Sequence, residues 1–255
     1  MRSWAMASGY AAPDFKPSVN RPSLSPSQRR QQEELTDDDE GGVPYSVDES
    51  KKIRGVLSDR TLPVWSRFGT LICMYAGFAP VDALDLLRNK GVIEWGKGKG
   101  GLVWYRNSRH KTAVRIFVPL APALAAALRP YRTAEGGIDI GEAIPIQLNS
   151  WREGYAEILG RAGVAKMKGQ NSKRLRTSFQ SIIETRIILT LPEGPTPVSA
   201  PVRRRLMAHT KVDRKEGAIG HYGYADPELM VAAVVQYEAY LERPVAATKA
   251  EPSAG

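Results

Sequence analysis

The sequence predicts an α+β fold that is mostly helical and contains a small three-stranded antiparallel sheet. Apolar residues recur at helical spacing along most of the chain, for example at Leu124, Leu128 and Tyr131. Three short runs near the middle instead alternate β-branched and aromatic residues, with a glycine-rich loop at 96–101 between the first two. Apolar residues make up 42% of the chain, which suffices for a sizeable core.

The expected elements form one domain between two tails. Residues 1–44 are rich in Pro, Ser and Gln and end in an acidic run, so we expect a disordered N-terminal tail. The domain is expected at 45–243, followed by a flexible C-terminal tail at 244–255. Alternating runs predict strands at 91–95, 102–106 and 113–118. Helical periodicity predicts helices at 48–58, 61–76, 80–88, 121–131, 150–162, 173–188, 198–208 and 226–242.

Prolines mark two further boundaries. Pro122 is a typical first residue for the helix at 121–131. Pro195, Pro197 and Pro201 predict an extended loop at Leu191–Val202, ahead of the helix that leads to His209. The last helix, at 226–242, has an amphipathic face that can pack on its own domain or on a partner.

Basic charge is concentrated in the part of the chain that is expected to fold. The whole chain has 36 Lys and Arg against 27 Asp and Glu, a net charge of +9. Residues 1–50 contain 5 basic and 9 acidic side chains, whereas residues 51–255 contain 31 basic and 18 acidic ones, a net charge of +13. This excess attracts polyanions and indicates a nucleic-acid partner, although it can also serve solubility alone.

Several functional classes are not indicated by the sequence. The one cysteine, Cys73, precludes an intrachain disulfide, which suits a reducing cytoplasm. The three histidines lack the spacing of a structural zinc site, and the glycine-rich loop lacks the features of a nucleotide-binding motif. No apolar run reaches the roughly 20 residues of a membrane span. We therefore expect no cofactor and no membrane association.

Two segments in the first half of the chain resemble the catalytic domain of the tyrosine recombinases, the phage-integrase family. Residues 43–49, Val-Pro-Tyr-Ser-Val-Asp-Glu, are similar to the opening of that domain, an extended stretch followed by a Ser or Thr cap and a helix. Residues 68–86 are similar to its helix, Thr-Gly-x-Arg turn and second helix. The first catalytic arginine of the family falls on position 79, where this sequence has Ala79.

The central motifs of the family are matched next. Lys111, in the Lys-Thr pair before the third expected strand, falls on the catalytic lysine of the family's β-hairpin. Residues 172–179, Ser-Lys-Arg-Leu-Arg-Thr-Ser-Phe, are similar to His-x-Leu-Arg-x-x-Phe. In this box Arg176 falls on the second catalytic arginine, and Lys173 stands where histidine is usual.

The last two motifs supply a histidine and a tyrosine. Residues 206–210, Leu-Met-Ala-His-Thr, are similar to Leu-x-Gly-His-Ser and place His209 on the family's last histidine. Residues 222–229, Tyr-Gly-Tyr-Ala-Asp-Pro-Glu-Leu, resemble the nucleophile box, with Tyr222 as the nucleophile and Tyr224 as the alternative. The interval from His209 to Tyr222 is about four residues longer than the family's usual one.

The resemblance implies a site-specific recombinase that acts on double-stranded DNA without a metal or cofactor. Tyr222 would attack a phosphodiester to form a 3′-phosphotyrosyl intermediate, and Lys111 would protonate the leaving 5′ oxygen. Lys173, Arg176 and His209 would stabilise the transition state. Further DNA contacts are expected from basic residues of the clusters around these motifs: Lys97, Lys99, Arg109, Lys168, Arg174, Arg203 and Arg204.

The resemblance covers the catalytic domain alone. We expect no room for the helical core-binding domain of the family, so DNA would be held more weakly and with less discrimination. The C-terminal helix would contact a neighbouring protomer in a homo-oligomer on DNA. Such a protein would work in the bacterial cytoplasm or nucleoid.

Ala79 leaves a second function open. A methyl group cannot replace a guanidinium that grips two phosphate oxygens, and losing such a donor costs a catalytic site about 3–4 kcal/mol. Arg67 and Arg88 are the nearest candidates in sequence to fill this position. The alternative is a catalytically degenerate DNA-binding protein: a regulator, an accessory factor or a mobile-element relic. Taken singly, each motif residue also fits an ordinary structural role, as a surface lysine, a polar helix face or a half-buried tyrosine.

Overall fold

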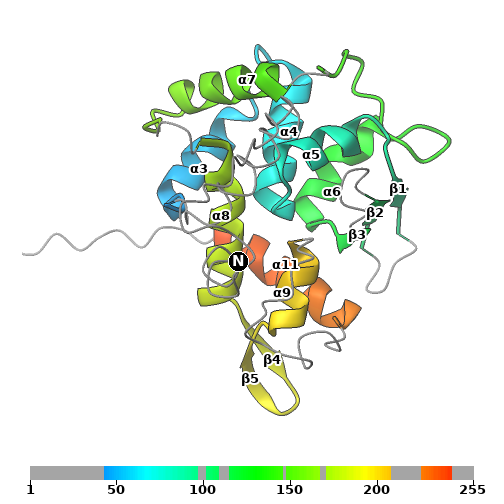
Figure 1. The fold of residues 1–255 in the computed structure, drawn as a ribbon, viewed down its shortest axis with the longest axis vertical. Helices are drawn as coiled ribbons and strands as arrows, with labels where there is room; N and C mark the ends of the chain where they lie inside the picture. Colours follow the sequence, from blue (N-terminus) through cyan, green and yellow to red (C-terminus); the bar gives the residue numbers. More distant parts are fainter. Residues whose placement is uncertain are drawn as a thin grey trace, which may run out of the picture. The chain divides into compact units, whose positions relative to one another are not determined.

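The computed structural model describes residues 43–96, 102–108, 115–145, 148–166, 171–207 and 225–242, without the side chains of 171 and 172. All of them belong to one compact unit, Gly42–Gly255. Helices predominate, and a three-stranded antiparallel sheet accompanies them (Figure 1). The predicted class, α+β and mostly helical, is therefore confirmed.

The helices follow the predicted order closely. They are α3 (Val47–Val56), α4 (Val64–Ala76), α5 (Pro80–Leu87), α6 (Pro122–Leu128), α7 (Leu148–Arg161), α8 (Asn171–Thr185), α9 (Ala200–Leu206) and α11 (Pro227–Glu242). A short 3₁₀ turn, Arg129–Tyr131, extends α6 to the predicted end at 131.

Local chemistry explains where the first helices begin and end. Ser46 caps α3 through a capping box with Glu49, in which each side chain accepts a hydrogen bond from the other residue's backbone N–H. α4 begins three residues later than predicted, because Pro63 is extended, with ψ at 135°. α4 ends at Gly77, whose φ of 63° lies in the left-handed region. Pro80 occupies a first-turn position of α5, where its missing N–H costs nothing.

The main sheet has its three strands in chain order. The strands are β1 (Val92–Glu94), β2 (Trp104–Ser108) and β3 (Arg115–Pro119), and all neighbours are antiparallel. Tyr105 in the central strand lies opposite Ile93 and Val118. The aromatic ring of Tyr105 is buried, and its hydroxyl donates to the backbone oxygen of Lys90 at 2.6 Å. This sheet therefore joins the core through its aromatic side chains.

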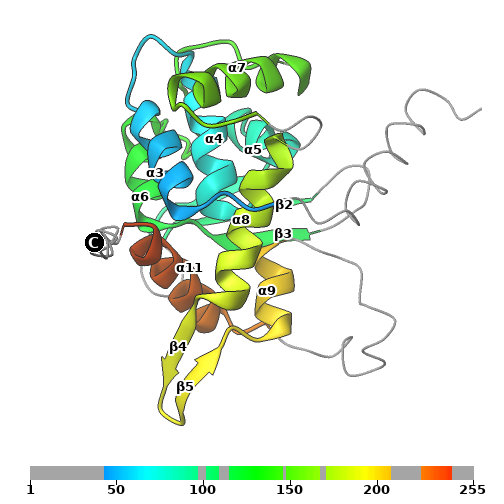
Figure 2. The ribbon, with the colours of Figure 1, turned by 90° about the vertical axis from the view of Figure 1, so that its left-hand side faces the viewer.

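α4 lies at the centre of the packing. Nine of its thirteen residues are buried, and it contacts α5, α6, α7, α8 and α11. α8 runs between α4 on one side and α9 on the other (Figure 2). The position of α8, which carries two of the predicted site residues, is therefore set by the core.

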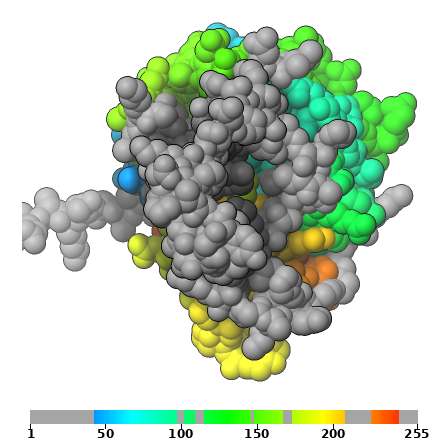
Figure 3. Space-filling model, in the orientation of Figure 1, coloured from blue at the N-terminus to red at the C-terminus, as the bar shows by residue number. Residues whose placement is uncertain are grey.

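The segment that we expected to be an extended loop before α9 is a β-hairpin. β4 (Ile188–Leu191) and β5 (Gly194–Pro197) pair antiparallel, with Leu191 opposite Gly194. Leu189 is buried, and β4 contacts α11. In the space-filling view the hairpin forms the yellow lower end of the face shown (Figure 3). The prediction of a loop was wrong because the prolines of this segment stand on the edge of a small sheet.

Gly77 allows the turn between α4 and α5 to lie directly on α8. A Cβ atom at this position would lie 2.8 Å from Cγ of Phe179 and closer still to Cδ1. Such a contact is impossible without a shift of the helix or of the ring. Position 77 therefore needs glycine both for its backbone conformation and for the close approach of α8.

We expect Gly77→Ala to lower the free energy of unfolding by at least about 2 kcal/mol, through left-handed strain and the clash with Phe179. Urea denaturation followed by circular dichroism measures this loss. Gly160→Ala is the matched control, because a Cβ atom at this position in α7 would meet nothing beyond its own helix within 4 Å. This control should be neutral or stabilising by about 0.5 kcal/mol. Equal effects of the two substitutions would contradict the role given to Gly77.

Candidate functional site

α8 carries two of the five predicted catalytic residues. Its apolar face buries Leu175 and Phe179 in the core. Lys173 and Arg176 are only half-buried. Helical periodicity therefore places these two cations outside the core.

The guanidinium of Arg176 is held by the end of α9. Its Nη2 donates to the backbone oxygen of Met207 at 2.8 Å. Met207 is the residue that follows the last turn of α9, and His209 comes two residues later in the sequence. The structure thus brings the second predicted arginine to the chain segment that leads into the predicted histidine.

The turn that contains Ala79 approaches the same part of α8. Gly77, two residues before Ala79, lies against Phe179, and Phe179 is about one helical turn beyond Arg176. Burial raises the pKa of the Cys73 thiol, the carboxylate of Asp82 raises it further, and Arg176 lowers it. Cys73 and Asp82 flank the turn on α4 and α5. Arg176 therefore lies within electrostatic range of the turn where the family has its first arginine.

Neither Arg67 nor Arg88, the two candidates to replace the missing arginine, occupies position 79. Arg88, at the end of α5, pairs with Asp85 and donates to the backbone oxygen of Pro145. Arg67 precedes Gly77 by ten residues of helix, or about 15 Å at 1.5 Å per residue. Position 79 itself is the alanine N-cap of α5, without a side-chain cap.

Two of the predicted DNA contacts lie on α9. Arg203 forms an ion pair with Glu184 of α8, so its charge is already matched within the protein. Arg204 is half-buried. The pair of Arg203 with Glu184 and the bond of Arg176 to Met207 together fix α9 along α8.

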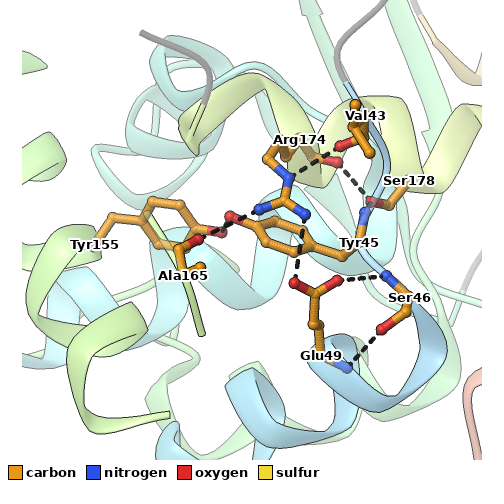
Figure 4. A network of polar contacts seen from close by, with 8 residues as sticks. All are labelled: Val43, Tyr45, Ser46, Glu49, Tyr155, Ala165, Arg174 and Ser178. Carbon is orange, nitrogen blue, oxygen red and sulfur yellow. Dashed lines mark hydrogen bonds and ion pairs between the residues drawn. The ribbon is translucent and has the colours of Figure 1, made fainter. Parts of the chain in front are cut away.

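Arg174, the third predicted DNA contact among the described residues, has a different role. Its side chain is almost fully buried, with 4% of the residue exposed. Its Nε donates to the backbone oxygen of Val43 at 2.9 Å, and its Nη2 pairs with Glu49 at 3.4 Å (Figure 4). The guanidinium carbon lies 3.9 Å from the centre of the Tyr45 ring. A DNA phosphate cannot reach a cation that is enclosed in this way, so the expected surface contact does not fit the structure.

A hydrogen-bonded chain of side chains completes this buried network. The hydroxyl of Ser178 donates to the backbone oxygen of Arg174 and accepts from the backbone N–H of Tyr45, both at 2.6 Å. The hydroxyl of Tyr155 donates to that of Tyr45 at 3.0 Å (Figure 4). Burial raises the pKa of both phenols, which therefore stay protonated at neutral pH. The network fastens the segment before α3 to the buried side of α8 and to α7.

Sequence reasoning did not find this network. The capping box of Ser46 and Glu49 is visible in the sequence as Ser-x-x-Glu, and it marks the start of α3. Nothing local indicates that Arg174, rather than Lys173 or Arg176, is the buried cation of α8. The partner that decides this, Val43, is 131 residues away in the chain.

The remaining predicted site residues lie outside the described residues. They are the catalytic candidates Lys111, His209, Tyr222 and Tyr224 and the DNA contacts Lys97, Lys99, Arg109 and Lys168. In the sequence, β3 follows Lys111, α9 precedes His209, and α11 follows Tyr222 and Tyr224. These three elements pack against one another.

The described residues contain no group of three His, Cys, Asp or Glu side chains that could hold a metal ion. Within the same residues, no single helix has the length and apolarity to cross a membrane. α4 and α5 pass that test only as a pair bent by 120°, by length and composition alone.

Comparison with known proteins gives no assignment. No protein-family model, no curated protein and no solved structure matches the chain.

The network of Arg174 makes stability depend on pH through Glu49. Partial burial opposes ionisation of this carboxyl, but the backbone N–H of Ser46 and the guanidinium of Arg174 outweigh it and lower the pKa of Glu49. A lowered folded-state pKa stabilises the fold above the unfolded value of about 4.3, and this stabilisation is lost as the pH falls through the folded value.

We expect Glu49→Gln, which retains the capping geometry, to lower the free energy of unfolding by roughly 1 kcal/mol at pH 7. The difference from the unmodified protein should shrink as the pH falls below the unfolded value of about 4.3. Denaturation curves across this range measure it, with Asp48→Asn, at the adjacent exposed carboxylate, as the control. A deficit that stays constant at all pH values would contradict the charge-based explanation.

Proposed function

We propose that the chain is a tyrosine-recombinase-like DNA strand-cleaving and rejoining enzyme, with the catalytic-domain fold of that family. The observation that carries the proposal is the hydrogen bond from Arg176 to Met207, because it joins two motifs that are separated in sequence. Six segments resemble the family in its own order, and helices and strands occur between them where the resemblance implies.

Chain connectivity supports a common site. A chain spans at most about 3.5 Å per residue, so the Cα atoms of His209 and Met207 are no more than about 7 Å apart. The same limit is about 14 Å between Lys111 and Arg115, which begins β3. For Tyr222 and Ala225 it is about 11 Å. Because β3, α9 and α11 pack together, these limits are compatible with one phosphate site beside Arg176.

The proposed reaction balances within the protein and the DNA. The phenolic oxygen of Tyr222 forms a bond to phosphorus as the bond from phosphorus to the 5′ oxygen breaks. The phenol proton leaves to a base or to water, and Lys111 supplies a proton to the 5′ oxygen. Lys173, Arg176 and His209 donate hydrogen bonds to the non-bridging oxygens. The phosphotyrosyl ester conserves the bond energy, so a second 5′ hydroxyl can reverse the step without a nucleotide.

A second candidate function is supported by Ala79. Neither Arg67 nor Arg88 lies at the turn that contains Ala79, so neither of them replaces the first arginine of the family. A protein that binds DNA and does not cleave it would retain the basic charge of residues 51–255 and would not need this donor. The two functions differ in whether a covalent adduct forms.

We expect nicked double-stranded substrates, which release the leaving strand after cleavage, to trap a covalent protein–DNA adduct on a denaturing gel. Tyr222→Phe should abolish the adduct, because phenylalanine lacks the attacking oxygen, whereas Tyr224→Phe should retain it. Loss of the adduct only in Tyr224→Phe would move the nucleophile to that residue. Salt-sensitive binding of the same DNA with no adduct would support the second function.

We expect Ala79→Arg to raise the rate of adduct formation by about two to three decades, since one preorganised donor to a phosphoryl oxygen is worth about 3–4 kcal/mol. A single-turnover time course measures this rate. Ala79→Lys is the control, because an ammonium lacks the planar fork and should restore less. No gain from arginine, in a variant that still folds and binds DNA, would show that position 79 is not part of the phosphate site.

A further inference from the structure

The β4–β5 hairpin has no part in the proposed reaction. It connects α8 to α9 and extends below both helices in the two ribbon views (Figures 1 and 2). Its inner face is fixed on the core, because Leu189 is 2% exposed and β4 contacts α11. The other face of the hairpin and the outer edge of β4 remain to be accounted for.

The backbone of β4 has an open edge. Leu191 and Gly194 flank the two-residue turn, so this pair exchanges hydrogen bonds within the hairpin. Because bonded positions alternate along an antiparallel pair, Thr190 and Ile188 direct their N–H and C=O groups away from β5. Within the described part of the chain, no other backbone group bonds to them. β4 therefore presents donors and acceptors in alternation along its outer edge.

The outward face beside this edge is largely apolar. Ile188 is 46% exposed, and the register places Pro197 opposite it and Pro195 opposite Thr190. Paired residues lie on the same face of a sheet, so the isoleucine and the two exposed prolines form one small apolar surface. An open strand edge beside an apolar face is a ready template for pairing with another strand.

Two charges at the ends of β4 indicate which strand fits this edge. Arg186, just before β4, and Glu193, in the turn just after it, are exposed, and neither forms an ion pair within the described residues. A second copy can pair antiparallel with β4 about a two-fold axis at Leu189, so that Ile188 of each copy lies opposite Thr190 of the other. Each outward N–H then meets an outward C=O. The same register brings Glu193 of each copy beside Arg186 of the other, so the edge is complementary to itself in hydrogen bonding and in charge.

We propose that the outer edge of β4 binds a second copy of this chain, in a two-fold contact that joins the two hairpins into one continuous sheet. The helical bodies lie at opposite ends of this sheet, because each hairpin is joined to its own body at the end away from its turn. The contact involves two short strands, and small interfaces are weak, so the expected dissociation constant is on the order of 100 µM. The contact needs no DNA and does not depend on the proposed function.

The first test removes one outward donor. Sedimentation velocity of the full chain, free of nucleic acid and at concentrations from about 5 to about 500 µM, should show a monomer–dimer equilibrium. Thr190→Pro should weaken the dimer at least about tenfold, because it deletes an N–H of the open edge. Proline is tolerated at this position, since the N–H is not used within the hairpin. Thr190→Val retains the N–H and is the matched control, which should dimerise like the unmodified chain.

The second test concerns the register. Arg186→Glu and Glu193→Arg each place like charges at both ends of the contact, so each should weaken the dimer by about tenfold at about 50 mM salt. An equimolar mixture of the two variants restores opposite charges at both ends. The mixed dimer should therefore form about tenfold more tightly than the dimer of either variant alone, and this preference should shrink at about 500 mM salt. Recovery in the mixture also shows that both variants fold.

Three outcomes would overturn the contact between hairpins. The first is a chain that stays monomeric at about 500 µM, far above the expected dissociation constant. The second is a dimer that Thr190→Pro leaves unchanged, such as one formed through α11. The third is a mixture of the charge variants that associates no more tightly than either variant alone. None of them bears on the proposed function, which is tested by the covalent adduct with DNA.

Discussion

The contact of Gly77 with Phe179 is the constraint on which the candidate site depends. It allows the turn between α4 and α5 to lie on α8, and α4 is the helix that the rest of the core surrounds. This packing sets the turn that contains position 79 against the helix that carries Arg176. The packing at the candidate site thus depends on the absence of a Cβ atom at position 77 and on the ring of Phe179.

The two arginines of α8 show how one helix serves the core and the surface at once. Residues two positions apart are rotated by about 200° around a helix, so Arg174 and Arg176 point to opposite sides. Arg174 is enclosed by Tyr45 and Glu49, where removing a partner would leave a buried charge. Arg176 is instead oriented by the backbone carbonyl of Met207. Under the proposed function, this orientation would lower the conformational entropy lost on binding a phosphate.

Much of the fold could be predicted from local signals, and the rest depends on distant contacts. Pro80 and Pro122 marked helix starts, and alternating residues marked the three strands of the main sheet, because these signals act within a few residues. The β4–β5 hairpin was missed, since its two-residue turn of Pro192 and Glu193 lacks the Asn-Gly or Gly-containing pair typical of such turns. The burial of Arg174 could not be predicted, because it is decided by residues more than one hundred positions away.

The prolines of the hairpin have a consequence for self-association. Backbone N–H groups alternate between the two edges of a strand, and a proline in a sheet is confined to a position whose missing N–H would face outward. Pro195 and Pro197 are two residues apart in β5, so both remove donors from the same outer edge. An added strand would find no hydrogen-bond donor at either position. The β5 edge of the hairpin is therefore a poor template for growth into larger sheets.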